Sequence, residues 1–373
     1  MELSVYINDP SSTSEIFLYQ LLNKLNERHK IEVISYKQKD KSKLNRNIKS
    51  KIIPPPLSLR FTASILYLFV KYRTGDIRLL YHLFVLEQAK SSKIYFPFLY
   101  MFATYTNVIK TFTEKNPEKA FYSSIRGTEI TVNPFIKSNA LSDYRKVLPF
   151  AKKIHFLSEH LFEQFNKLSL KAGDYSIIYQ GVDFEKFNIL NSKTIPRDKL
   201  RMVTVGRFDF IKGIEYLIYS CYLLKKMNID FQCTIIGYGP EKLKYLFMIN
   251  DLGLVPNVII HDTVSHEDLR RLLQQHNLYV HTHLVTGISN TMLEAFSCAL
   301  PVIAFNSEFD SYKIKNLNTY FKECERYNSF ALAELLQQFD FTQSIPFDDI
   351  NMILQKFTLQ NQADQFIDFF DFV

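Results

Sequence analysis

The sequence has few cysteines, few glycines, no tryptophan and no long apolar run, and some of these shortages exclude classes of protein. Its four cysteines all lie in the C-terminal half without a CxxC spacing, which excludes a disulfide scaffold and favours reduced, buried thiols. The longest apolar stretch, Phe61 to Val70, is too short to span a bilayer. The start, MELSVYINDP, has no basic segment before an apolar one. We therefore expect no signal peptide and a cytoplasmic location.

What the chain does contain is typical of a folded protein, with 47% hydrophobic and 22% charged residues. A chain of 373 residues exceeds one ordinary core, so two domains are expected. The net charge of +7 is uneven, because the basic excess lies in residues 1–185 and a slight acidic excess lies in residues 186–373. A basic half can attract nucleic acid, an anionic membrane surface or a phosphate-bearing substrate.

The densest basic stretch is KQKDKSKLNRNIKSK, from Lys37 to Lys51. It has no interleaved aromatic residues, so it lacks the stacking surfaces of a single-strand binder, and no nucleic-acid partner is expected. A solvated loop is the simplest interpretation. Attraction to an anionic membrane is the second, because two amphipathic segments follow directly, LSLRFTASILYLFVKYR and GDIRLLYHLFVL.

Strand-like and helix-like segments alternate along the chain. The runs typical of strands are LSVYIN, IEVISY, KIHFLS, YSIIYQG, RMVTVG, FQCTIIG, NVIIHD, LYVHTH and PVIAFN. Segments with helical spacing separate them, among them SSTSEIFLYQLLNKLNERHK, EYLIYSCYLLKKMN and HEDLRRLLQQHN. This alternation predicts an α/β fold of two doubly wound, Rossmann-like parallel sheets facing each other across a cleft. The polar segment from Asn188 to Leu200 is the best linker, so we place the domains at 1–190 and 200–355.

Two turns after predicted strands have the residues of an anion site. In VTVGRFDFIKGIEYL a strand ends at Gly206, and Arg207 and Lys212 lie between it and the next helix. A glycine turn and two cations before a helix N-terminus suit a diphosphate, although two exposed cations could also stand there by chance. The second turn, TIIGYGPEKLKYL, has Gly237 and Gly239 but no third glycine, so a dinucleotide site is not expected.

These segments, in this order, resemble retaining glycosyltransferases of family 4, which have the two-domain GT-B fold. The segments VGRFDFIKG, IIGYGPE and GISNTMLEAFSCALPV look like the donor domain of that family. SSTSEIFLYQLL, SIRGTEI, HFLSEHLFEQF and YQGVDFEKF resemble motifs of its colanic-acid and amylovoran exopolysaccharide type. FTLQNQADQFIDFF looks like the closing helix of the family, so we expect residues 356–373 to pack back toward the N-terminal domain.

The resemblance implies a role for each matching residue. It implies that Arg207 and Lys212 hold the donor diphosphate and stabilise the leaving group, which is work that a metal does elsewhere. The chain has no D-x-D, so no metal is expected, and no cofactor either, because the nucleotide sugar is the substrate. Glu294 matches the glutamate that binds the ribose. The other positions that match the donor site are Gly206, Gly237, Thr286, Gly287, Ile288 and Ser289.

The N-terminal matches are Ser14, Glu15, Gly127 and Glu129, on the acceptor side or in the cleft. Arg126 stands where the family has a histidine, and we include it among the catalytic residues because a guanidinium can bind donor phosphate or sugar. It cannot act as a base near neutral pH.

The chain also departs from the family. Thr286 replaces the first glutamate of E-x7-E and cannot supply a carboxylate, Ala299 replaces a glycine, and the GG-x-x-E segment is missing. His281 and His283 share one face of a strand, where packing or donor contact is favoured over a metal site.

The resemblance therefore implies a retaining, metal-independent glycosyltransferase for exopolysaccharide or cell-envelope glycans. Its substrates would be a nucleotide-sugar donor and a polysaccharide or lipid-linked acceptor at the inner membrane face. The alternative is a catalytically weakened homologue that acts as a binding partner or regulatory subunit of another glycosyltransferase. The sequence leaves the sugar, the nucleotide base, the acceptor and the oligomeric state open.

Overall fold

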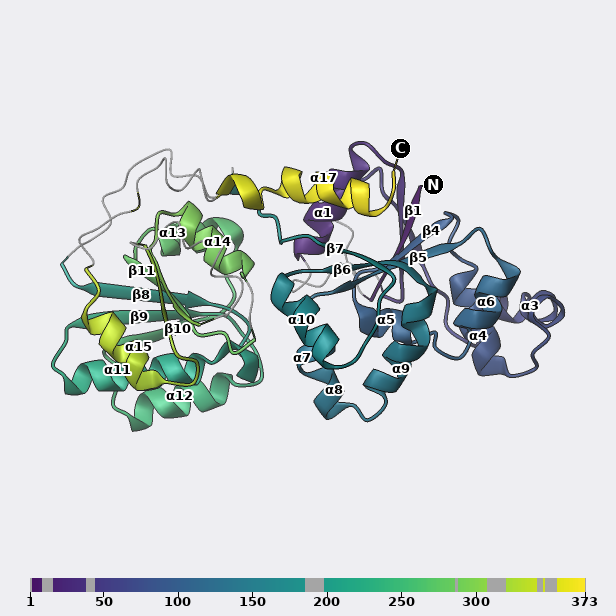
Figure 1. Ribbon diagram of the computed structural model, residues 1–373. Helices are drawn as coiled ribbons and strands as arrows, with labels where there is room; N and C mark the ends of the chain where they lie inside the picture. The colour runs from purple at the N-terminus through teal and green to yellow at the C-terminus, as the bar shows by residue number, and fades with distance from the viewer. Residues whose placement is uncertain are drawn as a thin grey trace. The chain divides into compact units, whose positions relative to one another are not determined.

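The computed structural model describes residues 2–8, 16–37, 44–184, 198–285, 288–306, 320–340, 345 and 354–372. These form two compact α/β units, shown in Figure 1. The first unit comprises residues 1–179 together with 359–373, and the second comprises residues 180–358. The predicted α/β architecture of two parallel-sheet domains is confirmed. The sequence placed the boundary at 190–200, whereas in the structure the second unit begins at Gln180.

The first unit is built on a seven-stranded sheet in the order β3-β2-β1-β4-β5-β6-β7. Every neighbouring pair is parallel, as expected when helices connect the strands. The strands are β1 (Leu3–Ile7), β2 (Ile31–Ser35), β3 (Lys49–Ile52), β4 (Lys93–Phe96), β5 (Ala120–Ile125), β6 (Ala151–Phe156) and β7 (Asp174–Ile177).

Helices cover this sheet and join its strands. They are α1 (Ile16–Asn26), α2 (Leu59–Thr62), α3 (Ile65–Tyr72), α4 (Ile77–Leu86), α5 (Leu99–Ala103), α6 (Ile109–Lys115), α7 (Thr128–Thr131), α8 (Asn133–Ile136), α9 (Ala140–Val147), the short 3₁₀ turn η2 (Leu148–Phe150), α10 (Glu159–Lys167) and the C-terminal α17 (Leu359–Phe369). Helix α1 shows why they form, because its leucines recur at helical spacing and are buried.

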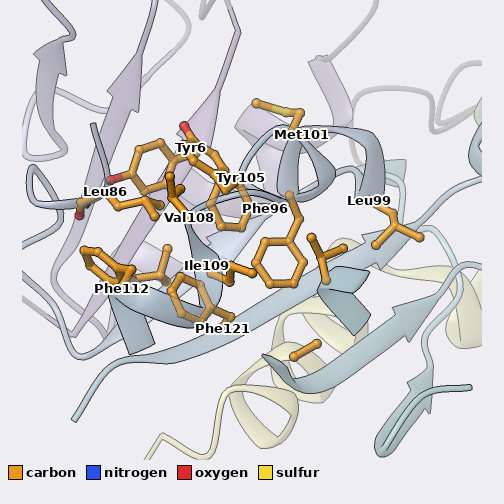
Figure 2. Close-up of a cluster of buried hydrophobic side chains, with 14 of the residues drawn as sticks. Tyr6, Leu86, Phe96, Leu99, Met101, Tyr105, Val108, Ile109, Phe112 and Phe121 are labelled. Atoms are coloured by element: carbon orange, nitrogen blue, oxygen red, sulfur yellow. Dashed lines mark hydrogen bonds between the residues drawn. The ribbon is translucent and has the colours of Figure 1, made fainter. Parts of the chain in front are cut away.

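The core of the first unit is largely aromatic. Phe96 of β4 stacks on Tyr6 of β1 with ring centroids 5.0 Å apart and on Phe102 of α5 at 5.1 Å. Figure 2 shows these strand residues meeting Tyr105, Val108 and Phe112 from the helical side. In a sequence without tryptophan, phenylalanine and tyrosine supply the large apolar surface that holds the helices to the sheet.

The C-terminal helix belongs to the first unit although it follows the second in sequence. Helix α17 packs on α1, and Phe366, Phe369 and Phe370 join the buried cluster on that side of the sheet. The Phe370 ring lies 5.1 Å from that of Tyr95 on β4. Asp371, just beyond the helix, forms an ion pair with Lys152 at 2.9 Å. The apolar residues of α17 therefore complete a core formed by residues at the start of the chain.

The second unit is built on a six-stranded parallel sheet in the order β10-β9-β8-β11-β12-β13. The strands are β8 (Leu200–Val205), β9 (Phe231–Ile236), β10 (Val258–His261), β11 (Leu278–His281), β12 (Val302–Phe305) and β13 (Phe321–Cys324). The helices are α11 (Ile214–Lys226), α12 (Lys242–Asp251), α13 (His266–Leu273), α14 (Asn290–Ser297) and α15 (Ser329–Gln337), with short 3₁₀ turns at η4 (Phe210–Lys212) and η7 (Gln355–Phe357).

The basic run of residues 37–51 is not entirely a loop. Its end, Lys49–Ile52, forms β3 and pairs in parallel with β2 at the edge of the sheet. Its residues are exposed or half-buried, so the strand lacks the apolar pattern by which strands are recognised. Pairing with its buried neighbour β2 makes it a strand.

Among the described helices, none combines the length and the apolar character needed to cross a membrane.

Candidate functional site

The candidate site lies at the carboxyl edge of the second sheet. Parallel strands end at the same edge, so the loops after β8, β9 and β11 meet there. The loop after β8 runs from Gly206 through η4 to Gly213 and is fixed to the loop after β11. Thr282 Oγ1 donates to the Lys212 carbonyl at 2.9 Å, and the Leu284 amide donates to the Ile211 carbonyl at 2.9 Å. The cation-bearing turn is therefore held in one position.

Two glycines make this loop possible. Gly213 has φ +58°, and a Cβ there would lie 2.3 Å from the Thr282 carbonyl oxygen. Gly237 has φ +153°, and a Cβ there would lie 1.9 Å from the Gly206 carbonyl oxygen. Both conformations and both approaches need the absence of a side chain. In the structure Gly237 therefore allows the loops after β8 and β9 to touch, which positions the backbone at Gly206.

Lys212 lies across the end of β8. Its alkyl chain passes within 3.6 Å of where a Gly206 Cβ would stand, and its Nζ lies 3.4 Å from Nδ1 of His283. Burial and, to a lesser extent, the nearby charge of Arg207 lower the pKa of Lys212 to about 8, while Asp209 opposes the shift. A half-buried ammonium with a lowered pKa is suited to an anionic ligand, which would raise that pKa back toward its ordinary value.

His283 provides a neutral surface beside this lysine. Its ring lies 3.8 Å from that of His281, centroid to centroid. Burial, His281 and Lys212 together keep the pKa of His283 well below its ordinary value. The neutral imidazole can therefore accept a hydrogen bond from the Lys212 ammonium. Within the described ranges, no cluster of three or more His, Cys, Asp or Glu side chains is arranged to hold a metal ion.

Arg207 stands at the open side of the same turn. Its side chain is 51% exposed and forms an ion pair with the less exposed Asp209. The aspartate orients the guanidinium, and the exposed part of the guanidinium remains available to a second anion. Arg207 and Lys212 therefore place two cations on one short loop, one exposed and one half-buried.

The N-terminus of α14 lies at the same edge. Ser289 caps the helix, because its Oγ accepts from the Met292 amide at 3.2 Å. Thr291, in the first turn, donates to the carbonyl of Val205, the last residue of β8, at 3.3 Å. Tyr279 of β11 donates to Thr291 Oγ1 at 2.8 Å. These bonds tie the positive end of the α14 dipole to the strand end that Gly206 follows, which adds to the attraction for an anion.

Glu294 lies in the second turn of α14 and is only 6% exposed. Burial raises the pKa of its carboxyl group to about 7. Ile288, just before the helix, is also buried. Ala299, just after it, has φ +57°, a left-handed conformation that glycine adopts at lower cost. Ala299 replaces a glycine of the family pattern, and the backbone at this position has a conformation that favours glycine.

The N-terminal candidates Arg126, Gly127 and Glu129 meet at the end of β5 in the first unit. The buried Glu129 accepts from the Gly127 amide at 3.0 Å and the Arg126 amide at 3.2 Å. Burial raises the pKa of Glu129. The Arg126 guanidinium donates to the Pro97 carbonyl at 3.2 Å and lies 4.7 Å from the Phe17 ring centroid. Glu129 thus shapes the backbone on which Arg126 is presented.

Four predicted site residues lie outside the described residues: Ser14, Glu15, Thr286 and Gly287. The remaining donor-site candidates gather around the end of β8 and the first turns of α14. The sequence did not reveal the contact of His283 with Lys212, the need for Gly213, or the tie from Tyr279 through Thr291. The only signal for Gly213 was its place directly before a helix. The other two contacts gave no signal, because they join residues from different elements.

The residues at the carboxyl edge of the second sheet lie in a segment that is similar to a known protein family. Residues 185–339 match the family model described as Glycosyl transferases group 1. The match lies within the second unit. The matched segment contains the loop with Gly206, Arg207 and Lys212, and it also contains Glu294.

Individual relatives share low sequence identity with this chain over part of its length. The chain is 25% identical over 193 residues to the amylovoran biosynthesis glycosyltransferase AmsK of Erwinia amylovora, covering 48% of this chain and 47% of that protein. It is 29% identical over 107 residues to the phosphatidylinositol N-acetylglucosaminyltransferase GPI3 subunit of Saccharomyces cerevisiae, covering 29% and 24%. The chain thus spans about half, or less, of the length of these relatives.

The fold of the whole chain also has solved counterparts. HepE of Anabaena, crystallised with UDP and glucose, has a TM-score of 0.75 and 14% identity and covers 100% of both chains. The fold is therefore that of the GT-B glycosyltransferases.

Proposed function

We propose that this protein is a glycosyltransferase that moves a sugar from a nucleotide-sugar donor to a polysaccharide or lipid-linked acceptor. One observation carries the proposal. Arg207, Lys212 and the N-terminus of α14 converge on the carboxyl end of β8, inside a segment that matches the group 1 glycosyltransferases. Two cations and a helix N-terminus are the elements from which proteins build diphosphate sites.

In this proposal the basic loop stabilises the departing nucleotide diphosphate. As the bond between the sugar and the diphosphate breaks, negative charge grows on the phosphate oxygens. Lys212 is half-buried and its turn is held by hydrogen bonds, so it can stabilise that charge with little reorganisation. Arg207 would bind the outer oxygens and release part of its pairing with Asp209. Glu294 would face the ribose hydroxyls, as the family resemblance suggests.

We propose that the transfer retains the configuration of the sugar and needs no metal ion. Retention without a protein nucleophile is possible when the acceptor hydroxyl attacks from the face that the diphosphate leaves. Thr286 in place of a glutamate is compatible with such a reaction, because the leaving diphosphate can take the acceptor proton. Arg126 would then be a donor-binding residue and not a base.

The first test measures donor binding before any acceptor is known. The melting temperature of the purified protein is followed with UDP-, GDP-, ADP- and CMP-sugars. One of these should raise it, because a ligand of the native state stabilises that state by mass action. With the donor so found, hydrolysis or transfer should fall by about 10²–10³ in Arg207→Ala and Lys212→Ala.

The matched controls are cations of the same unit outside the site. Arg271→Ala removes a 64% exposed arginine that is ion-paired like Arg207, and Lys226→Ala removes a lysine from the far end of α11. Both should keep full activity. No donor-induced stabilisation and no turnover would refute the proposal. Donor binding without turnover, together with co-purification of an active homologue, would instead favour the weakened partner or regulatory subunit.

A further inference from the structure

The first unit exposes an apolar face built from consecutive short helices. In α3 the outward residues are Leu66 at 73% exposure, Tyr67 at 57%, Phe69 at 50% and Val70 at 66%. The preceding segment adds Leu57 and Leu59, and the start of α4 adds Ile77; these are respectively 93%, 89% and 51% exposed. Single exposed apolar residues are common, but seven such residues within twenty-one positions of the chain are an unusual concentration, which indicates an interaction surface.

The orientation of α3 is fixed by its other face. Leu68 and Tyr72 are buried, and the Tyr72 hydroxyl bonds to Glu87. Lys71 donates to Glu87 at 2.5 Å and to Asn116 at 2.9 Å. These contacts hold α3 against α4 and α6, and Figure 1 shows it at the periphery of the unit beside those two helices. Rotating the helix to hide Leu66 and Val70 would expose Leu68 and break this network.

The charges around this face are almost all positive. Arg60, Arg73 and Arg78 are exposed at its margins, and residues 57–78 contain a single acid, Asp76. The Asp76 carboxylate caps α4 by accepting from the Arg78 amide at 2.8 Å. A helical apolar face with arginines at its rim and a tyrosine among its residues fits the boundary between lipid headgroups and acyl chains.

We propose that the surface formed by Leu57, Leu59, Leu66, Tyr67, Phe69, Val70 and Ile77 docks the protein on an anionic lipid membrane. The apolar side chains enter the headgroup region, while Arg60, Arg73 and Arg78 contact lipid phosphates. A second copy of this chain is a poorer occupant, because pairing two such faces would bring like-charged arginine rims together. The inference does not depend on the proposed transfer, since it concerns binding to lipid in the absence of any donor.

The experiment is co-sedimentation of the full chain with vesicles of phosphatidylcholine, with and without phosphatidylglycerol. The protein should sediment with the vesicles that contain phosphatidylglycerol, and added salt should weaken this binding. The variant Leu66→Glu with Val70→Glu should bind at least about tenfold more weakly, since it removes apolar contact and adds like charge. Both residues are exposed, so the melting temperature should not change.

A matched control is available on α12 of the second unit. Leu243 and Phe247 have the same spacing of four residues and similar exposure, 78% and 68%. Leu243→Glu with Phe247→Glu should bind vesicles as the unaltered protein does. A charge variant, Arg60→Gln with Arg73→Gln, should lose binding to anionic vesicles.

Three results would overturn the proposal. The first is no sedimentation of the unaltered protein with anionic vesicles. The second is an equal loss of binding in the α3 and α12 variants. The third is a concentration-dependent dimer, seen by analytical ultracentrifugation, that the α3 variant abolishes while vesicle binding remains; it would assign the face to a second copy of the chain.

Discussion

Two residues of the second unit, Lys212 and Glu294, lie where burial disfavours their charged forms. Burial lowers the pKa of Lys212 to about 8 and raises that of Glu294 to about 7. Solvated side chains of these types titrate far from neutral pH, so the two shifts bring ionisation into an accessible range. Each shift leads to a measurement.

For Lys212 the measurable quantity is donor affinity. The ammonium loses its proton as pH rises through about 8, so the affinity for the donor should fall above that pH. Lys212→Arg stays charged throughout and should remove this dependence, although its different shape will lower affinity at all pH values. Isothermal titration calorimetry across pH 6.5 to about 9.5 compares the two proteins. Identical pH profiles would show that Lys212 does not contact the donor.

For Glu294 the measurable quantity is the free energy of unfolding. Its native pKa lies above the unfolded value of 4.5, so the native state holds the proton more tightly. The associated stability is fully present below about pH 4.5 and is lost as pH rises through about 7, a change of about 3 kcal/mol. Glu294→Gln should flatten this slope in urea titrations, whereas the exposed Glu334→Gln should leave it unchanged. A slope that survives in Glu294→Gln would assign it to other groups.

At the scale of the element, the end of α14 is strained. Ala299 holds φ +57°, where a side chain costs about 1–2 kcal/mol, partly offset by the greater chain entropy that glycine loses on folding. Ala299→Gly should therefore stabilise the protein by about 0.5–1 kcal/mol. Ala295→Gly, within the same helix, should destabilise it by about 1 kcal/mol or more. Urea unfolding of both variants measures these opposite signs, and destabilisation by Ala299→Gly would show that the strain is absent.

Helices and strands could be predicted from the sequence wherever their buried side chains recur with a regular spacing. Strands β8 to β12 and helices α1, α11 and α13 follow apolar runs or helical spacing, and the structure confirms them. Strand β3 could not be predicted in the same way, because a polar edge strand depends on its neighbour. The segment that contains α3 was recognised as amphipathic, but the sequence did not reveal which of its apolar residues are exposed.

In the candidate site, too, features with a local sequence pattern could be predicted and contacts between separate elements could not. Arg207 and Lys212 could be identified because their spacing after a strand is local. The approach of Gly237 to Gly206 and the contact of Lys212 with His283 join loops that follow different strands. Such contacts depend on strand order, which the local sequence does not encode. The position of Thr286 remains a prediction from the family resemblance.

At the scale of the whole molecule, the first unit depends on residues that follow the second. Phe366 of α17 is fully buried and packs on His155, with ring centroids 4.8 Å apart. Phe366→Ala should destabilise the first unit by about 3–5 kcal/mol, because it leaves a cavity in the core. Phe330→Ala, at a site that is 60% exposed, should change stability by less than about 0.5 kcal/mol. Calorimetry can follow both variants, and a small effect of Phe366→Ala would mean that α17 is dispensable.

The return of the chain to its first unit has a consequence for biosynthesis. A ribosome synthesises every residue of the second unit before it makes α17. Throughout that time the first unit exposes the apolar surface that α17 will cover. The N-terminal unit is thus the first to be synthesised, yet it cannot be completed until α17 has been made. That unit needs protection from aggregation for longer than its position in the chain would suggest.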